Sequence, residues 1–221
     1  MRYRDRQDAG RQLADELAAY ANRSDVIVLA LPRGGVPVGA AVADRLHAPL
    51  DVWLVRKLGV PGYPELAMGA IAAGGIEVLN HDVLESLQIP QAQVAPVAAR
   101  ERIELERRAQ AFRGDRALPD VRGRVVILVD DGLATGATME AAILAVRTLA
   151  PSAIVVAVPV GAAETCDRLR RLADVLVCPQ TPFAFHAVGQ WYEDFSETTD
   201  DEVRRLLDAA AERSADSAVG R

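Results

Sequence analysis

The sequence predicts an α/β fold with a mainly parallel twisted sheet flanked by helices, and three observations support this prediction. The hydrophobic runs at 26–31, 125–130 and 153–160 are continuous and rich in β-branched residues, which is typical of strands covered on both faces. Helical periodicity follows each run, so strands and helices alternate. With 221 residues, of which 50% are hydrophobic, the chain is long enough for one domain, residues 1–221, with its own core.

The first quarter of the chain follows this alternation. Residues 5–21 are expected to form an amphipathic helix, because apolar side chains recur there at three- and four-residue spacing. The run at 26–31 is the first strand. A turn at 32–35 follows, and residues 36–46 form a short helix whose proline stands in the first turn, where proline is tolerated. The run at 50–55 is the second strand.

The segment from 57 to about 120 breaks the alternation, and we interpret it as a hood inserted into the α/β core. Prolines and glycines are frequent in 57–70, which predicts a loop. Residues 68–79 fit a hairpin with a glycine pair at its turn. The periodicity over 82–112 is helical.

The second half of the chain returns to the alternation of strands and helices. The elements expected there are, in order, a strand at 125–130, a helix at 138–149, a strand at 153–160, a helix at 163–172, a strand at 175–179, an aromatic segment at 180–196 and a helix from about 200 to 211. This order places at least three strands in one parallel sheet, with helices available for both of its faces.

Composition and charge exclude some classes of function. A net charge of −6 argues against a broad basic face for nucleic acid. The longest apolar run, 153–163, is shorter than the roughly 18 residues that a membrane-spanning helix needs. The charged N-terminus lacks the apolar core of a secretory signal. We therefore expect a cytoplasmic protein that binds neither nucleic acid nor membrane.

The stretch VVILVDDGLATGATM, residues 125–139, carries the clearest chemical signal. A buried strand leads into two aspartates, and a loop of small residues then opens a helix. Bare backbone N–H groups and a helix N-terminus form a site for a phosphate monoester. The residues expected to hold the phosphate are Ala134, Thr135, Gly136, Ala137 and Thr138.

The adjacent aspartates Asp130 and Asp131 cannot bind phosphate, because their charges would repel it. They suit sugar hydroxyls or Mg²⁺, and the sequence leaves both alternatives open. Neighbouring residues on a regular strand point to opposite faces. Both carboxylates can therefore reach one ligand only if the chain leaves strand geometry at Asp131.

Two further segments end predicted strands. Arg33, Gly34 and Gly35 follow the first strand and could offer a cation and bare N–H groups to a second anion, although such a sequence is also a common turn. Lys57, which is the only lysine of the chain, follows the second strand, and the alternative there is a solvated surface. Because ligands bind at the carboxyl ends of parallel strands, we expect these segments to meet at one edge of the sheet.

The stretch 125–139 resembles the 5-phosphoribosyl-1-pyrophosphate (PRPP) signature of the type I phosphoribosyltransferase family. The segments LPRGGVPV, VRKLG, PELAMGAI and WYEDF also resemble uncharacterised bacterial phosphoribosyltransferase-domain proteins. The resemblance implies transfer of phosphoribosyl from PRPP to a nitrogenous base-like acceptor, with Mg²⁺ as cofactor and release of pyrophosphate. The alternatives are a regulator that binds PRPP or a nucleotide without catalysis, and a hydrolase of phosphoribosyl compounds.

The same resemblance implies roles for particular residues. Asp130 and Asp131 would orient the ribose hydroxyls or hold Mg²⁺, and Lys57 completes the catalytic candidates. Residues 134–138 would hold the 5′-phosphate. Pyrophosphate would lie against Lys57 and the turn at 32–35, where the family often has a non-proline cis peptide, here between Pro32 and Arg33.

The acceptor is the part of the prediction that the motifs define least. Hypoxanthine–guanine enzymes of the family have an aspartate where this chain has Ala134, so that chemistry is disfavoured and no general base is identified. Phe185, Trp191 and Tyr192 in the aromatic segment could stack on a planar acceptor. The alternative is a packing lid over the sheet edge. The resemblance also makes a homodimer possible.

Overall fold

A five-stranded parallel sheet forms the centre of the structure, a computed structural model that describes residues 2–114 and 116–219. The strands lie in the order β2-β1-β6-β7-β8, and every neighbouring pair is parallel. The strands are β1 (Val26–Ala30), β2 (Leu50–Val52), β6 (Val125–Val129), β7 (Ala153–Ala157) and β8 (Val175–Val177). The predicted fold class is confirmed.

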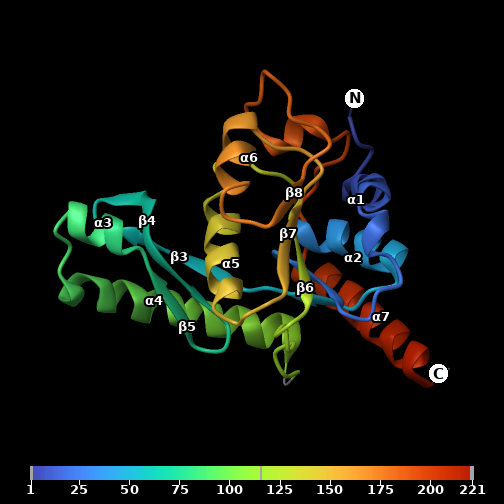
Figure 1. Cartoon of the computed structure of the whole chain (residues 1–221), viewed down its shortest axis with the longest axis horizontal. Helices are drawn as coiled ribbons and strands as arrows, with labels where there is room; N and C mark the ends of the chain where they lie inside the picture. Colours follow the sequence, from blue (N-terminus) through green and yellow to red (C-terminus); the bar gives the residue numbers. More distant parts are fainter. Residues whose placement is uncertain (1, 115, 220–221) are drawn as a thin grey trace.

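Helices cover both faces of this sheet, as Figure 1 shows. The helices are α1 (Arg6–Glu16), α2 (Gly35–Leu46), α5 (Ala137–Arg147) and α6 (Ala163–Leu169), with short 3-10 helices at Ala18–Tyr20 and Val188–Trp191. Because side chains alternate along a strand, Leu29 and Leu128 pack on the side of α5 and α6. Val28 and Ile127 pack on the side of α1 and α2. The continuous apolar runs are thereby explained.

The hood has its own antiparallel sheet, which corrects two expectations. Its elements are β3 (Val55–Val60), β4 (Tyr63–Ala72), β5 (Ile76–Leu79), α3 (His81–Ser86) and α4 (Gln91–Arg113). The predicted loop at 57–70 is wrong, because its residues form most of β3 and β4. The predicted strand at 50–55 is divided, since β2 ends at Val52 and the hood sheet begins at Val55.

The prolines and glycines of this region explain why it was predicted as a loop. Gly62 has φ +84° in the turn between β3 and β4, and Gly59 lies where the pairing register of those strands shifts. Glycine at turns and bulges is compatible with a hairpin. The expected hairpin at 68–79 is confirmed in β4 and β5, with Gly74 and Gly75 both at positive φ in its turn.

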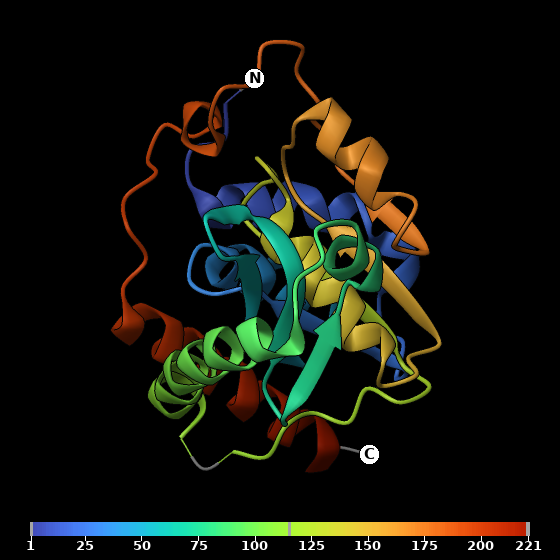
Figure 2. The same ribbon diagram turned by 90° about the vertical axis from the view of Figure 1, so that its left-hand side faces the viewer.

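An ion pair at the end of α4 joins the hood to the central sheet. Arg113, which is 5% exposed, lies 2.9 Å from Asp51 of β2 and also donates to the carbonyl of Ala117. Burial raises the pKa of Asp51, and Arg113 partly offsets this effect. The last helix, α7 (Asp200–Val219), runs beside α4 (Figures 1 and 2) and is longer than the expected 200–211.

None of the helices within the described residues is long and apolar enough to cross a membrane.

We expect Arg113→Met to lower the free energy of unfolding by roughly 3 kcal/mol, because it leaves the Asp51 carboxylate in a partly buried position without its cation. Urea unfolding of the two proteins measures the change. Arg122→Met is the control, since Arg122 is exposed, and should shift stability by less than about 0.5 kcal/mol. Equal losses in the two variants would show that the ion pair does not anchor the hood.

Candidate functional site

The acidic pair and the turn at 32–35 lie side by side because β1 and β6 are paired in register. Ala30 lies opposite Val129, and the N–H of Leu31 donates to the carbonyl of Val129 at 2.8 Å. Both strands end at the same edge of the sheet. The expected meeting of these two segments is therefore present.

Two glycines allow the turn to lie directly against the acidic pair. A β-carbon on Gly35 would stand 2.7 Å from the carbonyl oxygen of Val129 and 2.9 Å from the Cα of Asp130. A β-carbon on Gly34 would overlap the carboxylate of Asp131. Gly35 is thus required by the close approach of two backbones, whereas Gly34 leaves room for the side chain of Asp131. The peptide bond between Pro32 and Arg33 is cis, as expected.

The two aspartates lie beyond the end of β6 and share a partly buried space. The carboxylate of Asp130 accepts the N–H of Asp131 at 2.9 Å. Burial raises the pKa of Asp130 well above its ordinary value, and the charge of Asp131 raises it further. Burial also raises the pKa of Asp131, but the guanidinium of Arg6 partly offsets that effect.

Arg6 is a site residue that the sequence did not reveal. Its Nε donates to Asp131 Oδ2 at 2.8 Å, and its Nη1 donates to the carbonyl of Ser196 at 2.6 Å. The guanidinium carbon lies 3.9 Å from the ring centroid of Phe195, a cation–π distance. Arg6 and Asp131 are 125 positions apart, and no local motif marks an arginine in the first turn of an amphipathic helix as a partner of the acidic pair.

The loop at 134–138 presents backbone donors as predicted. Within the part of the chain that the structure describes, the N–H groups of these five residues donate no hydrogen bond to the protein. Gly136 precedes α5 with φ +70°, a conformation that favours glycine. A β-carbon there would stand 2.5 Å from a methyl carbon of Thr165. The positive φ and the closeness of Thr165 on α6 therefore each favour glycine at position 136, in addition to the close approach of a ligand that the sequence predicts.

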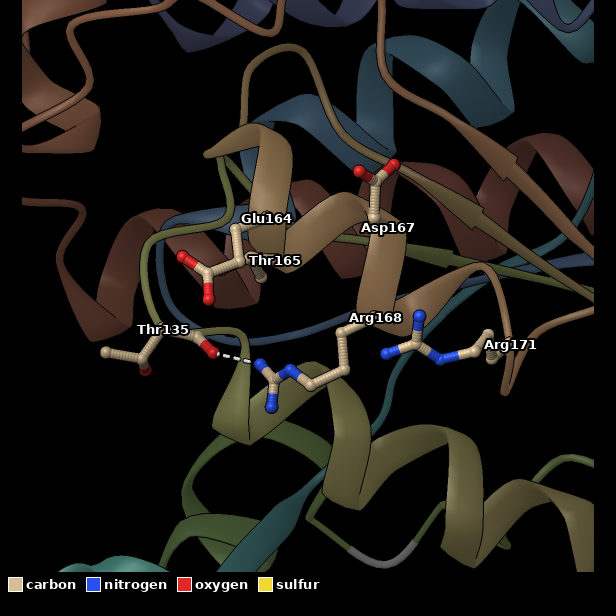
Figure 3. Close-up of a pocket in the computed structure, with 6 residues that line it drawn as sticks. All are labelled: Thr135, Glu164, Thr165, Asp167, Arg168 and Arg171. Carbon is tan, nitrogen blue, oxygen red and sulfur yellow. Dashed lines mark hydrogen bonds between the residues drawn. The ribbon is translucent and has the colours of Figure 1, made fainter.

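A cavity of about 670 Å³ adjoins this loop (Figure 3). Its lining comes from the loop, from α6 and from the turn after α6, and consists of Thr135, Glu164, Thr165, Asp167, Arg168 and Arg171. The guanidinium of Arg168 points at the loop and donates to the carbonyl of Thr135. The cavity therefore lies beside the carbonyl side of the loop.

The two cations expected at the pyrophosphate position are placed differently from each other. Arg33 stands in the turn against the acidic pair, and its guanidinium pairs with Glu197 and, at 3.4 Å, with Asp200 at the start of α7. Lys57 lies within β3 opposite Ala70, so its expected place at the end of a parallel strand is wrong. The anion-binding roles of both residues stay predictions.

The aromatic segment packs the two ends of the chain together. Tyr192 is 4% exposed, its hydroxyl donates to the carbonyl of Asp131 at 2.6 Å, and its ring centroid lies 5.6 Å from that of Tyr3. Phe185 and Trp191 are half-buried against the same cluster. These positions favour the packing alternative for Tyr192. Contact with an acceptor stays a prediction for all three residues.

Comparison with known proteins gives consistent results. Residues 3–194 match the sequence profile described as the phosphoribosyl transferase domain. Rv0571c and MT0597 of Mycobacterium tuberculosis, both named as candidate phosphoribosyl transferases, are each 50% identical to the chain over 206 residues, which is 93% of this chain and 46% of theirs. The chain thus spans about half the length of these curated relatives.

Two solved structures also match. The crystal structure of TT1426 from Thermus thermophilus superposes with a TM-score of 0.88 at 46% identity, over 94% of this chain and 98% of that one. The AQ2163 protein from Aquifex aeolicus has a TM-score of 0.51 at 13% identity, over 83% of this chain and 78% of that one. The second match shows similarity of fold alone.

We expect Asp130→Asn to raise the free energy of unfolding at pH 7, because it removes a buried carboxyl group whose charged form is disfavoured. The raised pKa of Asp130 means that the folded chain binds a proton that the unfolded chain releases near pH 4. Stability therefore falls as pH rises above about 4, and an amide avoids this loss.

Unfolding measured from about pH 4 to 8 should show the gain growing with pH. Asp15→Asn is the control, because Asp15 is an exposed aspartate on α1. A gain in stability that does not change with pH would contradict the effect of burial on Asp130.

Proposed function

The chain belongs to the phosphoribosyl transferase domain family, and on this premise we propose that it transfers phosphoribosyl from PRPP to a nitrogenous base-like acceptor, releasing pyrophosphate. The observation that carries the proposal is the loop at 134–138, whose N–H groups face no partner in the described protein and stand next to an acidic pair. A phosphate site next to a site for sugar hydroxyls fits a phosphorylated ribose.

The 5′-phosphate would be held by the loop. The N–H groups of residues 134–138 and the hydroxyls of Thr135 and Thr138 supply donors, and α5 adds the positive end of its dipole. Since these groups are fixed by the backbone before a ligand arrives, little ordering is needed on binding. This is a favourable site for a dianionic monoester.

The acidic pair would orient the ribose hydroxyls and hold Mg²⁺. The donor set fits this ion, because Mg²⁺ is commonly bound by one or two carboxylates together with water and substrate oxygens. The described residues place no third acidic, cysteine or histidine side chain in a metal-binding cluster with Asp130 and Asp131. When bound, Mg²⁺ would neutralise charge on the pyrophosphate. Arg6 would keep the Asp131 carboxylate ionised and oriented.

The leaving group would lie against the turn at 32–35. Transfer breaks the bond between C1 of the ribose and pyrophosphate, and the resemblance implies an oxocarbenium-like transition state. The N–H of Gly34 and the cation of Arg33 would stabilise the departing charge. The expected N–H of Gly35 is engaged, because it donates to the carbonyl of Leu31 at 3.0 Å. Lys57 would approach from the hood.

A specific observation favours a second candidate function, a PRPP or nucleotide-binding regulator without transferase activity. Arg33 is engaged by Glu197 and Asp200, and Ala134 removes the carboxylate that purine enzymes for hypoxanthine and guanine use. Pyrophosphate release, measured with PRPP–Mg²⁺ and a panel of purine, pyrimidine and other nitrogenous acceptors, separates the two functions. Release that requires one acceptor supports transfer, whereas tight PRPP binding without release supports the regulator.

We expect the double substitution of Asp130→Asn and Asp131→Asn to abolish detectable binding of PRPP–Mg²⁺ while the chain stays folded. The two amides keep similar shape but lose the charges that hold ribose and metal. Isothermal titration calorimetry measures the affinity, and circular dichroism checks the fold. Wild-type affinity in the double variant would contradict the assignment.

We expect Arg33→Ala to weaken pyrophosphate binding about tenfold, which corresponds to about 1.4 kcal/mol, because a charge-assisted contact is lost. Arg45→Ala is the control, since Arg45 is an exposed arginine on α2. Both affinities are measured by calorimetry with Mg²⁺–pyrophosphate. An unchanged affinity for Arg33→Ala would remove this residue from the site.

A further inference from the structure

The carbonyl groups of the phosphate loop are tied to α6. The hydroxyl of Thr165 donates to the carbonyl of Ala134 at 2.6 Å, and the guanidinium of Arg168 donates to the carbonyl of Thr135 (Figure 3). Thr165 is 8% exposed. Because residues three apart lie on one face of a helix, one side of α6 holds two successive carbonyls.

Because of the geometry of the peptide unit, these two hydrogen bonds also fix the direction of N–H groups in the loop. In a trans peptide the C=O and the following N–H point in opposite directions, and the cis bond of the described chain is at Pro32–Arg33. Tying the carbonyls of Ala134 and Thr135 toward α6 therefore points the N–H groups of Thr135 and Gly136 away from it. Those are the groups that the loop would offer to a phosphate.

The surrounding structure fixes α6 in the position that this requires. The N–H of Leu133 donates to the carbonyl of Val160, and the N–H of Ala162 donates to the carbonyl of Leu133, both at 2.9 Å. The start of the loop and the start of α6 are thus joined through their backbones. On the other side, Arg168 forms an ion pair of 2.8 Å with Glu140 of α5. The guanidinium is thus held between α5 and the loop.

We propose that Thr165 and Arg168 are positioning residues that aim the N–H groups of the loop at the 5′-phosphate. This inference rests on the proposed function. In this interpretation, Thr165 and Arg168 in the wall of the cavity of Figure 3 support the loop. Neither side chain touches the substrate, and both act through the carbonyls of Ala134 and Thr135.

The test compares two ligands on the whole chain by calorimetry. Ribose 5-phosphate probes the loop, and Mg²⁺–pyrophosphate probes the turn at 32–35. We expect Thr165→Val to weaken ribose 5-phosphate about fivefold and Arg168→Gln about tenfold, since each removes a hydrogen bond that orients the loop and the second is charge-assisted. Pyrophosphate affinity should stay within about twofold.

Two matched variants control for changes in packing and charge. Thr165→Ser keeps the hydroxyl and should restore the affinity that Thr165→Val loses. Arg171→Gln removes the same charge from the wall of the same cavity, and Arg171 donates no side-chain bond to the loop, so its affinity for ribose 5-phosphate should equal that of the wild type.

Each result decides between the proposals. Selective weakening of ribose 5-phosphate, with rescue by Thr165→Ser, supports the positioning role. The positioning role is overturned if Thr165→Val and Arg168→Gln bind ribose 5-phosphate with wild-type affinity, or if they weaken ribose 5-phosphate and pyrophosphate equally. Either result leaves the proposed function standing. If the wild type binds neither ribose 5-phosphate nor PRPP, the proposed function fails, and the positioning role fails with it.

Discussion

Asp131 is the point at which three segments that are far apart in the sequence meet. Its carboxylate accepts a hydrogen bond from Arg6, its carbonyl accepts one from Tyr192, and its side chain occupies the space beside Gly34. A second acid, Asp130, precedes it in the chain. Two adjacent carboxylates in a partly buried place are unfavourable. The raised pKa of Asp130 relieves part of this cost, and Asp131 requires a cation, which Arg6 of the N-terminal helix supplies.

This requirement explains how the chain ends are arranged. Arg6 can reach Asp131 only if the start of α1 lies over the carboxyl end of β6, and the ring of Phe195 and the carbonyl of Ser196 hold its guanidinium there. The rings of Tyr3 and Tyr192 pack against each other. The aromatic segment therefore serves the acidic pair through Arg6, which gives WYEDF a structural role that is independent of any acceptor.

Local signals predicted the parts of the molecule that depend on neighbouring residues. The buried strands, the glycines of the turn and the loop at 134–138 are each encoded within a few positions, and the structure contains all of them. The hood was misread because its prolines and glycines lie at turns and register shifts of real strands. The expected place of Lys57 is wrong for a different reason, because β2 ends at Val52 and Lys57 belongs to β3 of the hood sheet.

The residues that sequence reasoning missed act through tertiary contacts. Arg6, Thr165 and Arg168 reach the site from separate helices, and their partners are carboxylates or carbonyls that no spacing rule relates to them. An arginine on a helix is usually a solvated side chain. Only the packing of α1 and α6 around the end of β6 distinguishes Arg6 and Arg168 from the other arginines of the chain.

The position of Arg33 follows from the same consideration of charge. Its partner Glu197 is exposed and its partner Asp200 is half-buried, and exposed ion pairs contribute about 0–1 kcal/mol. Pyrophosphate carries several charges and would meet Arg33 beside the N–H of Gly34, and hydrogen bonds to ionised groups are stronger than neutral ones. If Arg33 binds pyrophosphate, it exchanges a weak pair for a stronger one. Glu197 and Asp200 then hold the guanidinium near the turn without competing strongly for it.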